Sequence, residues 1–168
     1  ELIDQFFTLS KLESNDTDIE LSKVNLSEIC RESILDFYEI LTNDHFQVEI
    51  KVPEMPVYVM GNTEALQRIF SNLISNAIRY GADGAYLGLF LIIEEEKVIV
   101  KVVDHGKGIE KAFADSVFER LFTMEDSRSR KVQGNGLGLT IAKNLTEKLQ
   151  GSLTLESTAG VITTFTLQ

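Results

Sequence analysis

Two pairs of neighbouring β-rich runs constrain the fold of this chain more than any other feature. Residues 86–94 and 97–103 flank the acidic turn Glu94-Glu95-Glu96, and residues 152–156 and 162–167 form a second pair. Each pair predicts a β-hairpin with antiparallel strands. A largely antiparallel sheet collects its helices on one face. We therefore expect the α+β class: a two-layer α/β sandwich with a mixed, mostly antiparallel sheet and helices on one face.

The longest helix is expected over residues 63–80, where apolar and polar side chains separate into two stripes at helical spacing. The apolar stripe faces the core and comprises Leu66, Ile69, Phe70, Leu73, Ile74 and Ala77. A polar stripe runs along its edge and comprises Arg68, Asn72, Asn76 and Arg79.

Shorter elements complete the expected fold. Helices are predicted over residues 1–14, from a cap at Asn25 or Ser27 to residue 41, and over 137–149. We expect the last of these to stop at a left-handed Gly151. Strict alternation predicts a half-buried strand over 46–52, and a brief strand is expected over 57–59.

Length and composition indicate one globular domain. The chain has 168 residues, of which 43% are hydrophobic, and this suffices for one core. Its formal net charge of −10 argues against nucleic acid as a partner, because phosphates are bound by clustered Lys and Arg. Cys30 is alone, so no disulfide is expected, and it reads as a small buried hydrophobe.

No run approaches 18 consecutive apolar residues, which predicts a soluble, cytoplasmic domain. The chain opens in a helical pattern without an initiator Met, so we expect a piece of a longer protein.

Three polar segments are candidates for one binding site. In the first, the carboxamides of Asn72 and Asn76 lie four residues apart on one helix edge. Their oxygens suit Mg²⁺, which prefers hard oxygen ligands together with water and nucleotide phosphates. For an isolated pair, two polar residues flanking the core are the more economical interpretation.

The second segment follows the strand 97–103. Asp104 ends this apolar strand at the sheet edge, where its carboxylate can accept a hydrogen bond from an exocyclic amine such as that of adenine. Gly106 and Gly108 allow the backbone to turn closely beneath a ring. Taken alone, a simple turn at the end of the strand is the favoured interpretation, because Asp and Gly are the usual turn residues.

The third segment precedes the helix 137–149. Gly134-Asn-Gly136-Leu-Gly138 exposes backbone N–H groups at a helix start, which favours bound phosphate; a flexible tether is the alternative. The 25 or so residues before it form a long loop, as is typical of functional lids. Cations in this loop either meet the phosphates or form a solvated basic face; they are Arg120, Arg128, Arg130 and Lys131.

Neither common phosphate loop is present. Leu139 stands where a Gly-x-Gly-x-x-Gly motif starting at Gly134 needs its third glycine, and Lys107 is not followed by Ser or Thr. In their order and spacing, the three segments instead resemble the N, G1 and G2 boxes of the ATP-binding domain of sensor histidine kinases, in the gyrase/Hsp90/kinase/MutL superfamily. Phe118-Glu-Arg120-Leu-Phe122 resembles the F box of these kinases.

The resemblance covers roughly residues 19–168. It implies a Bergerat-type fold, ATP and Mg²⁺ as ligands, and a role for each matched residue. In the first box, Asn76 would bind Mg²⁺ with Asn72 beside it, and Arg79 and Tyr80 would lie near the phosphates. In the second box, Asp104 would accept a hydrogen bond from adenine, and Gly106 and Gly108 would line the base pocket. The third box would form the hinge and the phosphate-facing start of the last helix; its residues are Gly134, Gly136, Leu137 and Gly138. Thr163 would support Asp104. Ile162 departs from the Gly usual before this Thr.

The resemblance also implies what surrounds the domain. Residues 1–15 look like the tail of the dimerisation helix, and 16–168 like the catalytic ATP-binding domain. The phosphoacceptor is absent, because His45 and His105 both lack its helical context. The implied partners are the dimerisation and phosphoacceptor domain of the same kinase, a cognate response regulator and a second copy in the full-length homodimer. The parent protein is expected to be membrane-anchored.

The reaction implied is transfer of the γ-phosphate of ATP to a His on the absent domain. ATPase relatives have a Glu one helical turn before the Mg²⁺-binding Asn, and here Asn72 stands there. Without that general base, a kinase is favoured over a hydrolase. Two alternatives stay open: a Ser kinase of the same superfamily, and a non-catalytic nucleotide-binding interaction module.

Overall fold

The computed structural model describes residues 2–14, 18–119, 136–158 and 162–167, and the expected sandwich is present. Five strands form one sheet in the order β2-β4-β5-β7-β6, and only the β2–β4 pair is parallel. The strands are β2 (Gln47–Lys51), β4 (Tyr86–Glu94), β5 (Lys97–Asp104), β6 (Leu153–Thr158) and β7 (Ile162–Leu167). Both predicted hairpins are confirmed, as β4–β5 and β6–β7.

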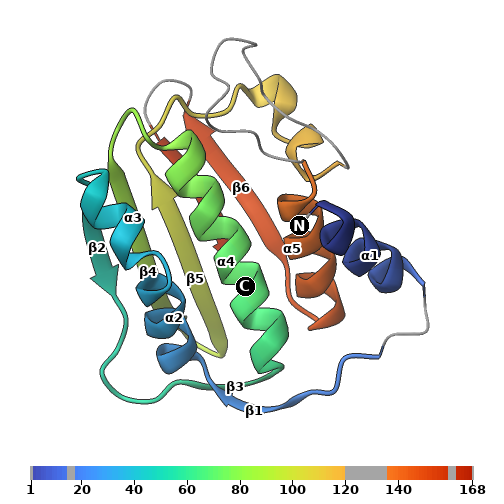
Figure 1. Ribbon diagram of the computed structural model, residues 1–168. Helices are drawn as coiled ribbons and strands as arrows, with labels where there is room; N and C mark the ends of the chain where they lie inside the picture. Colours follow the sequence, from blue (N-terminus) through green and yellow to red (C-terminus); the bar gives the residue numbers. More distant parts are fainter. Residues whose placement is uncertain (1, 15–17, 120–135, 159–161, 168) are drawn as a thin grey trace.

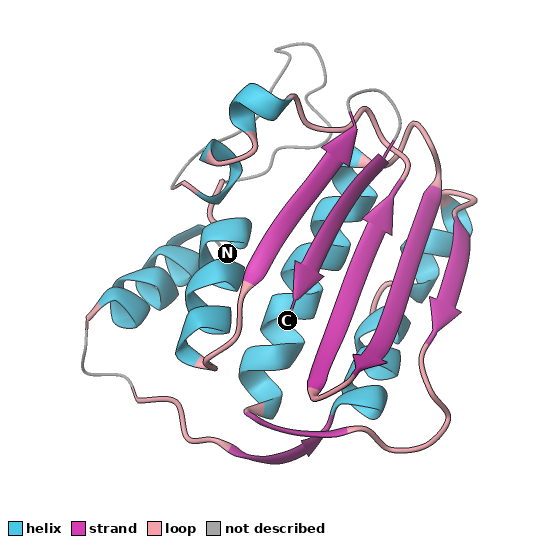
Figure 2. Ribbon diagram, turned by 180° about the vertical axis from the view of Figure 1, so that it is seen from behind, coloured by secondary structure: helices cyan, strands magenta, loops and turns pink. Residues whose placement is uncertain are grey.

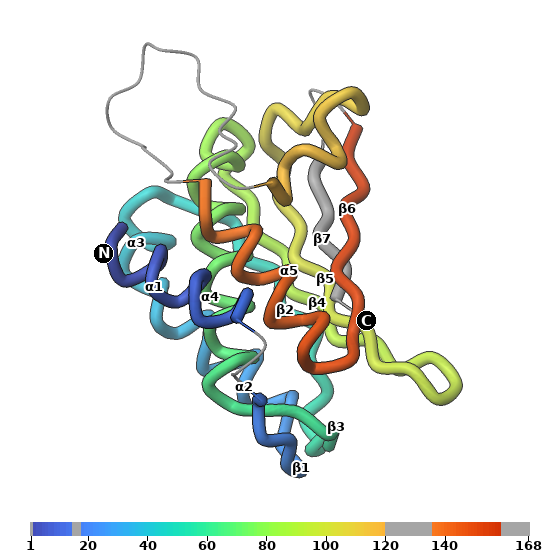
Figure 3. The backbone as a smooth tube through the Cα atoms, turned by 90° about the vertical axis from the view of Figure 1, so that its right-hand side faces the viewer, coloured from blue at the N-terminus to red at the C-terminus, as the bar shows by residue number. Residues whose placement is uncertain are grey.

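Helices cover one face of this sheet, as Figures 1 and 2 show from opposite sides and Figure 3 shows edge-on. The helices are α1 (Leu2–Glu13), α2 (Leu26–Leu35), α3 (Tyr38–Asn43), α4 (Thr63–Tyr80) and α5 (Gly138–Lys148). Short 3₁₀ turns η1 (Lys111–Phe113) and η2 (Ser116–Phe118) precede α5, and β1 (Ser22–Asn25) pairs with β3 (Tyr58–Gly61) in a separate ribbon. The two-layer fold with helices on one face is therefore confirmed.

The central helix α4 anchors the core. Every member of its predicted apolar stripe is buried, and Ile69, Phe70, Leu73 and Ile74 have no exposed surface. The Asn62 carboxamide oxygen caps the helix by accepting from the Ala65 N–H (3.0 Å). Burying one such apolar side chain contributes about 1.5–3 kcal/mol. The polar stripe, from Arg68 to Arg79, is half-buried at the edge of this core.

Local predictions are wrong at three places. The expected helix 25–41 is broken: α2 starts at the cap Asn25, and a turn at Asp36 and Phe37 separates it from α3. The left-handed residue after α5 is Gln150 (φ 64°) rather than Gly151. The expected half-buried strand β2 lies at the sheet edge, so Val48 and Ile50 are 38% and 45% exposed.

Candidate functional site

Asp104 is a buried carboxylate at the end of β5. Its side chain is 2% exposed, and among the described residues its one hydrogen bond comes from the Gly106 N–H, which donates to Oδ1 (2.9 Å). Burial raises the pKa of Asp104 to about 6, although the Gly106 hydrogen bond opposes this. A buried carboxylate with so few donors is well suited to accept a hydrogen bond from a ligand.

The end of α4 packs directly on this carboxylate without intervening side chains. A Cβ built on Gly81, which follows α4, would lie 2.7 Å from the Asp104 Cβ. A Cβ on Gly106 would lie 2.8 Å from the Gly81 Cα and would overlap the Tyr80 carbonyl oxygen. The first and second predicted segments therefore meet backbone to backbone. Gly108 adopts φ 69°, a conformation that favours glycine.

The third segment contacts the same helix, α4, at Asn72. A Cβ built on Gly138, the first residue of α5, would lie 3.8 Å from Asn72 Oδ1, so the two residues are neighbours. Asn72 Nδ2 is buried and has no hydrogen-bond partner among the described residues. It is the Asn72 Oδ1, not this Nδ2, that lies beside the helix start, and a buried polar atom without a partner is an exception in a folded protein.

The start of α5 is arranged to present backbone donors. In the described part of the chain no side chain caps its first turn, and Gly136 just before it has φ 67°. Thr140, in the first turn, donates its hydroxyl to the Phe118 carbonyl oxygen (2.8 Å) and so fastens η2 to this helix. Uncapped N–H groups at a helix start favour an anion there.

The other predicted site residues are placed as follows. Asn76 and Arg79 are half-buried on the same edge of α4 as Asn72, and Tyr80 is exposed at its end. Leu137 is buried beside the start of α5. Thr163 is opposite Asp104 in the β5–β7 register, and its side chain is not described. Predictions for Gly134, Arg120, Arg128, Arg130 and Lys131 lie outside the described residues.

The structure therefore places two of the predicted segments against α4: Asp104 and Gly106 pack on its end, and Gly138 lies beside Asn72 in its middle. Strand β5, which ends at Asp104, points to the upper end of the sheet in Figure 1. No cluster of three or more His, Cys, Asp or Glu side chains suited to a metal occurs in the described ranges. A cation at this site would instead depend on carboxamide oxygens and on the ligand, as the sequence predicts for Asn76.

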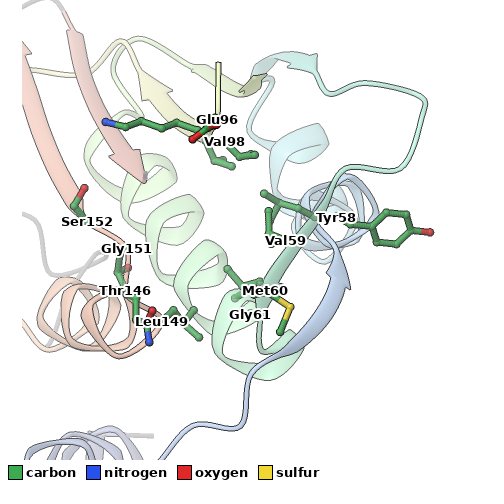
Figure 4. A pocket seen from close by; sticks show the side chains of 15 residues that line it. Tyr58, Val59, Met60, Gly61, Glu96, Val98, Thr146, Leu149, Gly151 and Ser152 are labelled. Atoms are coloured by element: carbon green, nitrogen blue, oxygen red, sulfur yellow. The ribbon is translucent and has the colours of Figure 1, made fainter. Parts of the chain in front are cut away.

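A pocket at the opposite end of the sheet contains none of the predicted residues. It lies between β3, the turn before Val98 and the end of α5, as Figure 4 shows, with Met60, Thr146 and Ser152 around it. Its lining lacks the buried carboxylate and glycine contacts of the Asp104 end. We therefore locate the candidate site at Asp104, because of the chemistry of its residues, and not at this pocket.

Two features of the site were missed from the sequence. Gly81 was not singled out, although it allows α4 to contact Asp104. His105 was considered only as a phosphoacceptor, yet its ring stacks on Tyr86 with centroids 3.9 Å apart. The hairpin register contains the signal for this stack, since Leu87 pairs with Asp104 and Tyr86 is therefore next to His105.

The family described as "Histidine kinase-, DNA gyrase B-, and HSP90-like ATPase" matches residues 61–168, which include every segment of the site. The chain belongs to this family. The sequence resemblance to the catalytic ATP-binding domain of sensor histidine kinases is thereby confirmed, and named relatives agree with it.

Sensor histidine kinase YcbM of Bacillus subtilis is 46% identical over 167 residues, which are 99% of this chain and 54% of that protein. Sensor histidine kinase RppB of Synechocystis is 36% identical over the whole chain, which covers 37% of its length. The chain thus spans about half or less of these relatives.

The fold is shared with a solved full-length kinase, ShkA in complex with AMPPNP. The TM-score is 0.84 at 19% identity, over 99% of this chain and 34% of ShkA. The expected Bergerat-type arrangement is therefore confirmed. Among the described residues, no helix is both long and apolar enough to cross a membrane.

Proposed function

We propose that this domain binds ATP with Mg²⁺ and supplies the γ-phosphate to a His on the dimerisation domain of a sensor histidine kinase. The observation that supports this most is the convergence on α4: Asp104 is buried against its end, and Gly138 lies beside the orphaned amide of Asn72. One end of the site is thus suited to an amine donor and the other to phosphate oxygens.

The base would bind at Asp104. Its carboxylate accepts from the adenine amine, and the glycine contacts at Gly81 and Gly106 keep the floor of this pocket free of side chains. Guanine has an acceptor where adenine has its amine, so a carboxylate disfavours it.

The phosphates would bind between α4 and α5. The backbone N–H groups of the first turn of α5 donate to phosphate oxygens beside Asn72, and Arg79 adds positive charge from the edge of α4. Asn76 would hold Mg²⁺, which neutralises charge on the phosphates when bound.

The chain's own residues favour transfer to a protein over transfer to water. Asn72 is at the helical position where ATPase relatives carry a Glu, and a carboxamide does not take a proton from water. The nucleophile must therefore come from outside, from the phosphoacceptor domain. A response regulator would accept the phosphoryl group in turn, and the parent protein would act as a membrane-anchored homodimer.

Nucleotide titration of Asp104→Asn tests the proposal. One charge-assisted hydrogen bond is worth about 1.5–3 kcal/mol, so we expect ATP to bind about ten- to a hundredfold more weakly in isothermal titration calorimetry. Asp83→Asn is a matched control, since this exposed carboxylate pairs only loosely with Lys107 (3.8 Å). An ATP dissociation constant in Asp104→Asn equal to that of the control would remove Asp104 from base recognition.

A further inference from the structure

Tyr86, on the outer face of the sheet away from the helices, contacts the turn formed by residues 104–106 after β5. Leu87 points into the core and is fully buried, so its neighbour Tyr86 is on the outer face. The Tyr86 ring stacks on the His105 imidazole, with centroids 3.9 Å apart and planes 12° from parallel. His105 is the residue between Asp104 and Gly106, the two partners of the hydrogen bond in the pocket.

Tyr86 is itself fixed from its far end. Its hydroxyl donates to Glu49 Oε2 on β2 (2.7 Å), and Glu49 also pairs with Lys51 (2.8 Å). Burial and this hydrogen bond raise the pKa of Tyr86 to about 12, so the hydroxyl stays a donor at neutral pH. Tyr86 is only 9% exposed.

Gly88 makes room for this arrangement. A Cβ built on Gly88 would lie 3.0 Å from the Tyr86 hydroxyl and 2.5 Å from the Phe90 ring, so both rings lie over the glycine. The Tyr86 side chain can therefore extend along the sheet from His105 to Glu49. The cross-strand contacts link the β2 edge to the turn after β5.

The backbone of the 104–106 turn also packs closely against neighbouring backbone at two glycines, Gly84 and Gly106. A Cβ built on Gly84 would overlap the His105 carbonyl oxygen, and Gly106 packs against Tyr80 and Gly81. These contacts fix where the backbone lies. The His105 ring adds a side-chain contact on the sheet face opposite to Asp104, because successive side chains point to opposite faces.

We propose that Tyr86 is a positioning residue for nucleotide binding: by stacking on His105, it sets the direction of the Asp104 carboxylate on the opposite face. This rests on the proposed role of Asp104. Tyr86 does not touch the ligand and acts through the turn. A well-oriented acceptor binds more tightly than one that must be ordered first.

Tyr86→Leu removes the stack and the hydroxyl, and Phe90→Leu is the matched control on the same strand and face. Aromatic pairs are worth a two- to tenfold change in an equilibrium, and we expect ATP to bind Tyr86→Leu weaker by about that factor. Phe90→Leu should bind ATP like the wild type. Tyr86→Phe, which keeps the ring, should fall between them.

A double-mutant cycle separates positioning from general loosening. If Tyr86 acts through Asp104, the loss caused by Tyr86→Leu should vanish in an Asp104→Asn background. An equal loss in both backgrounds would overturn the proposal while leaving the role of Asp104 intact. If Asp104→Asn alone does not lower the affinity for ATP, the proposed function is overturned instead.

His105→Ala provides a second route if Tyr86→Leu folds poorly, because His105 is exposed and its ring is the other half of the stack. His105→Ala should lower the affinity for ATP by the same factor as Tyr86→Leu. The double variant Tyr86→Leu/His105→Ala should show no further loss of ATP affinity. The stack also predicts upfield-shifted imidazole proton resonances for His105, present in Phe90→Leu and lost in Tyr86→Leu. Wild-type ATP affinity in folded His105→Ala would overturn the proposal.

Discussion

At the scale of single residues, Asp104 combines a negative charge with burial, and the two oppose each other in the free protein. The raised pKa means that the folded state disfavours the ionised carboxylate. The difference between the ordinary value of 3.8 and about 6 corresponds to about 3 kcal/mol of lost stability at neutral pH. The site therefore reduces the stability of the free domain in return for an acceptor that a ligand amine can use.

The sign of this effect gives a pH prediction. Between pH 4 and 6 the folded state keeps a proton that the unfolded chain has released, so the Asp104 contribution is fully present below pH 4 and is lost as pH rises through 6. Asp104→Asn should be more stable than wild type above pH 6, by up to about 3 kcal/mol, with the advantage shrinking towards pH 4. Urea denaturation at a series of pH values measures it; a pH-independent difference would contradict it.

Asn76 should act through the cation. The Asn76 carboxamide oxygen is proposed to bind Mg²⁺. Asn76→Ala should therefore raise the dissociation constant for ATP about tenfold or more with Mg²⁺ present, and change it little in excess chelator. Gln67→Ala, on the exposed side of the same helix, is the control. Titrations in the two buffers decide the matter. An equal loss in both would mean that Asn76 contacts the nucleotide or the core directly.

At the scale of elements, the start of α5 and the turn after β5 both depend on glycine, for different reasons. A Cβ on Gly138 meets Asn72 only at ordinary contact distance, 3.8 Å, whereas one on Gly106 would overlap the backbone of Tyr80. Gly106 is therefore required by packing. Gly138 lies where the proposed phosphates approach the helix start.

Gly138→Ala and Gly106→Ala should consequently behave differently. In Gly138→Ala the free energy of unfolding should stay within about 1 kcal/mol of wild type, or rise, while ATP affinity falls as the methyl group meets the phosphates. Gly106→Ala should lose more than 1 kcal/mol of stability because the backbone must move. Chemical denaturation and nucleotide titration test both. Unchanged ATP affinity in Gly138→Ala would contradict the phosphate site.

The elements also show what the sequence could predict. Hairpins, the α4 stripe and the meeting of the three segments follow from local periodicity and from residues whose roles repeat within a family. The break at Phe37, the left-handed Gln150 and the exposure of β2 depend on which strand lies at the edge and on how helices end against neighbours. Such tertiary contacts override local pattern. The stack of Tyr86 on His105 likewise required the register of β4 against β5.

At the scale of the whole molecule, the chain belongs to an ATP-binding family, and we propose that its phosphoacceptor His is on another domain. Helix α1 packs on α5, and its Leu9 is fully buried. Leu2, Ile3, Phe6 and Phe7 on the same helix are exposed. These exposed apolar side chains agree with the proposal that α1 is the tail of a dimerisation helix. They would then pack against the remainder of that helical pair.

The last prediction is that this chain hydrolyses ATP negligibly alone, yet phosphorylates a His when its matching dimerisation domain is supplied. Asn72 provides no base for water, and alignment of an incoming nucleophile with the γ-phosphate provides most of the rate in such transfers. Radiolabelled ATP should give a phosphoprotein whose label is lost in acid and kept in base, and Asp104→Asn should reduce labelling at low ATP. Rapid turnover by the isolated chain, or acid-stable label on Ser, would assign the domain to its ATPase or Ser kinase relatives instead.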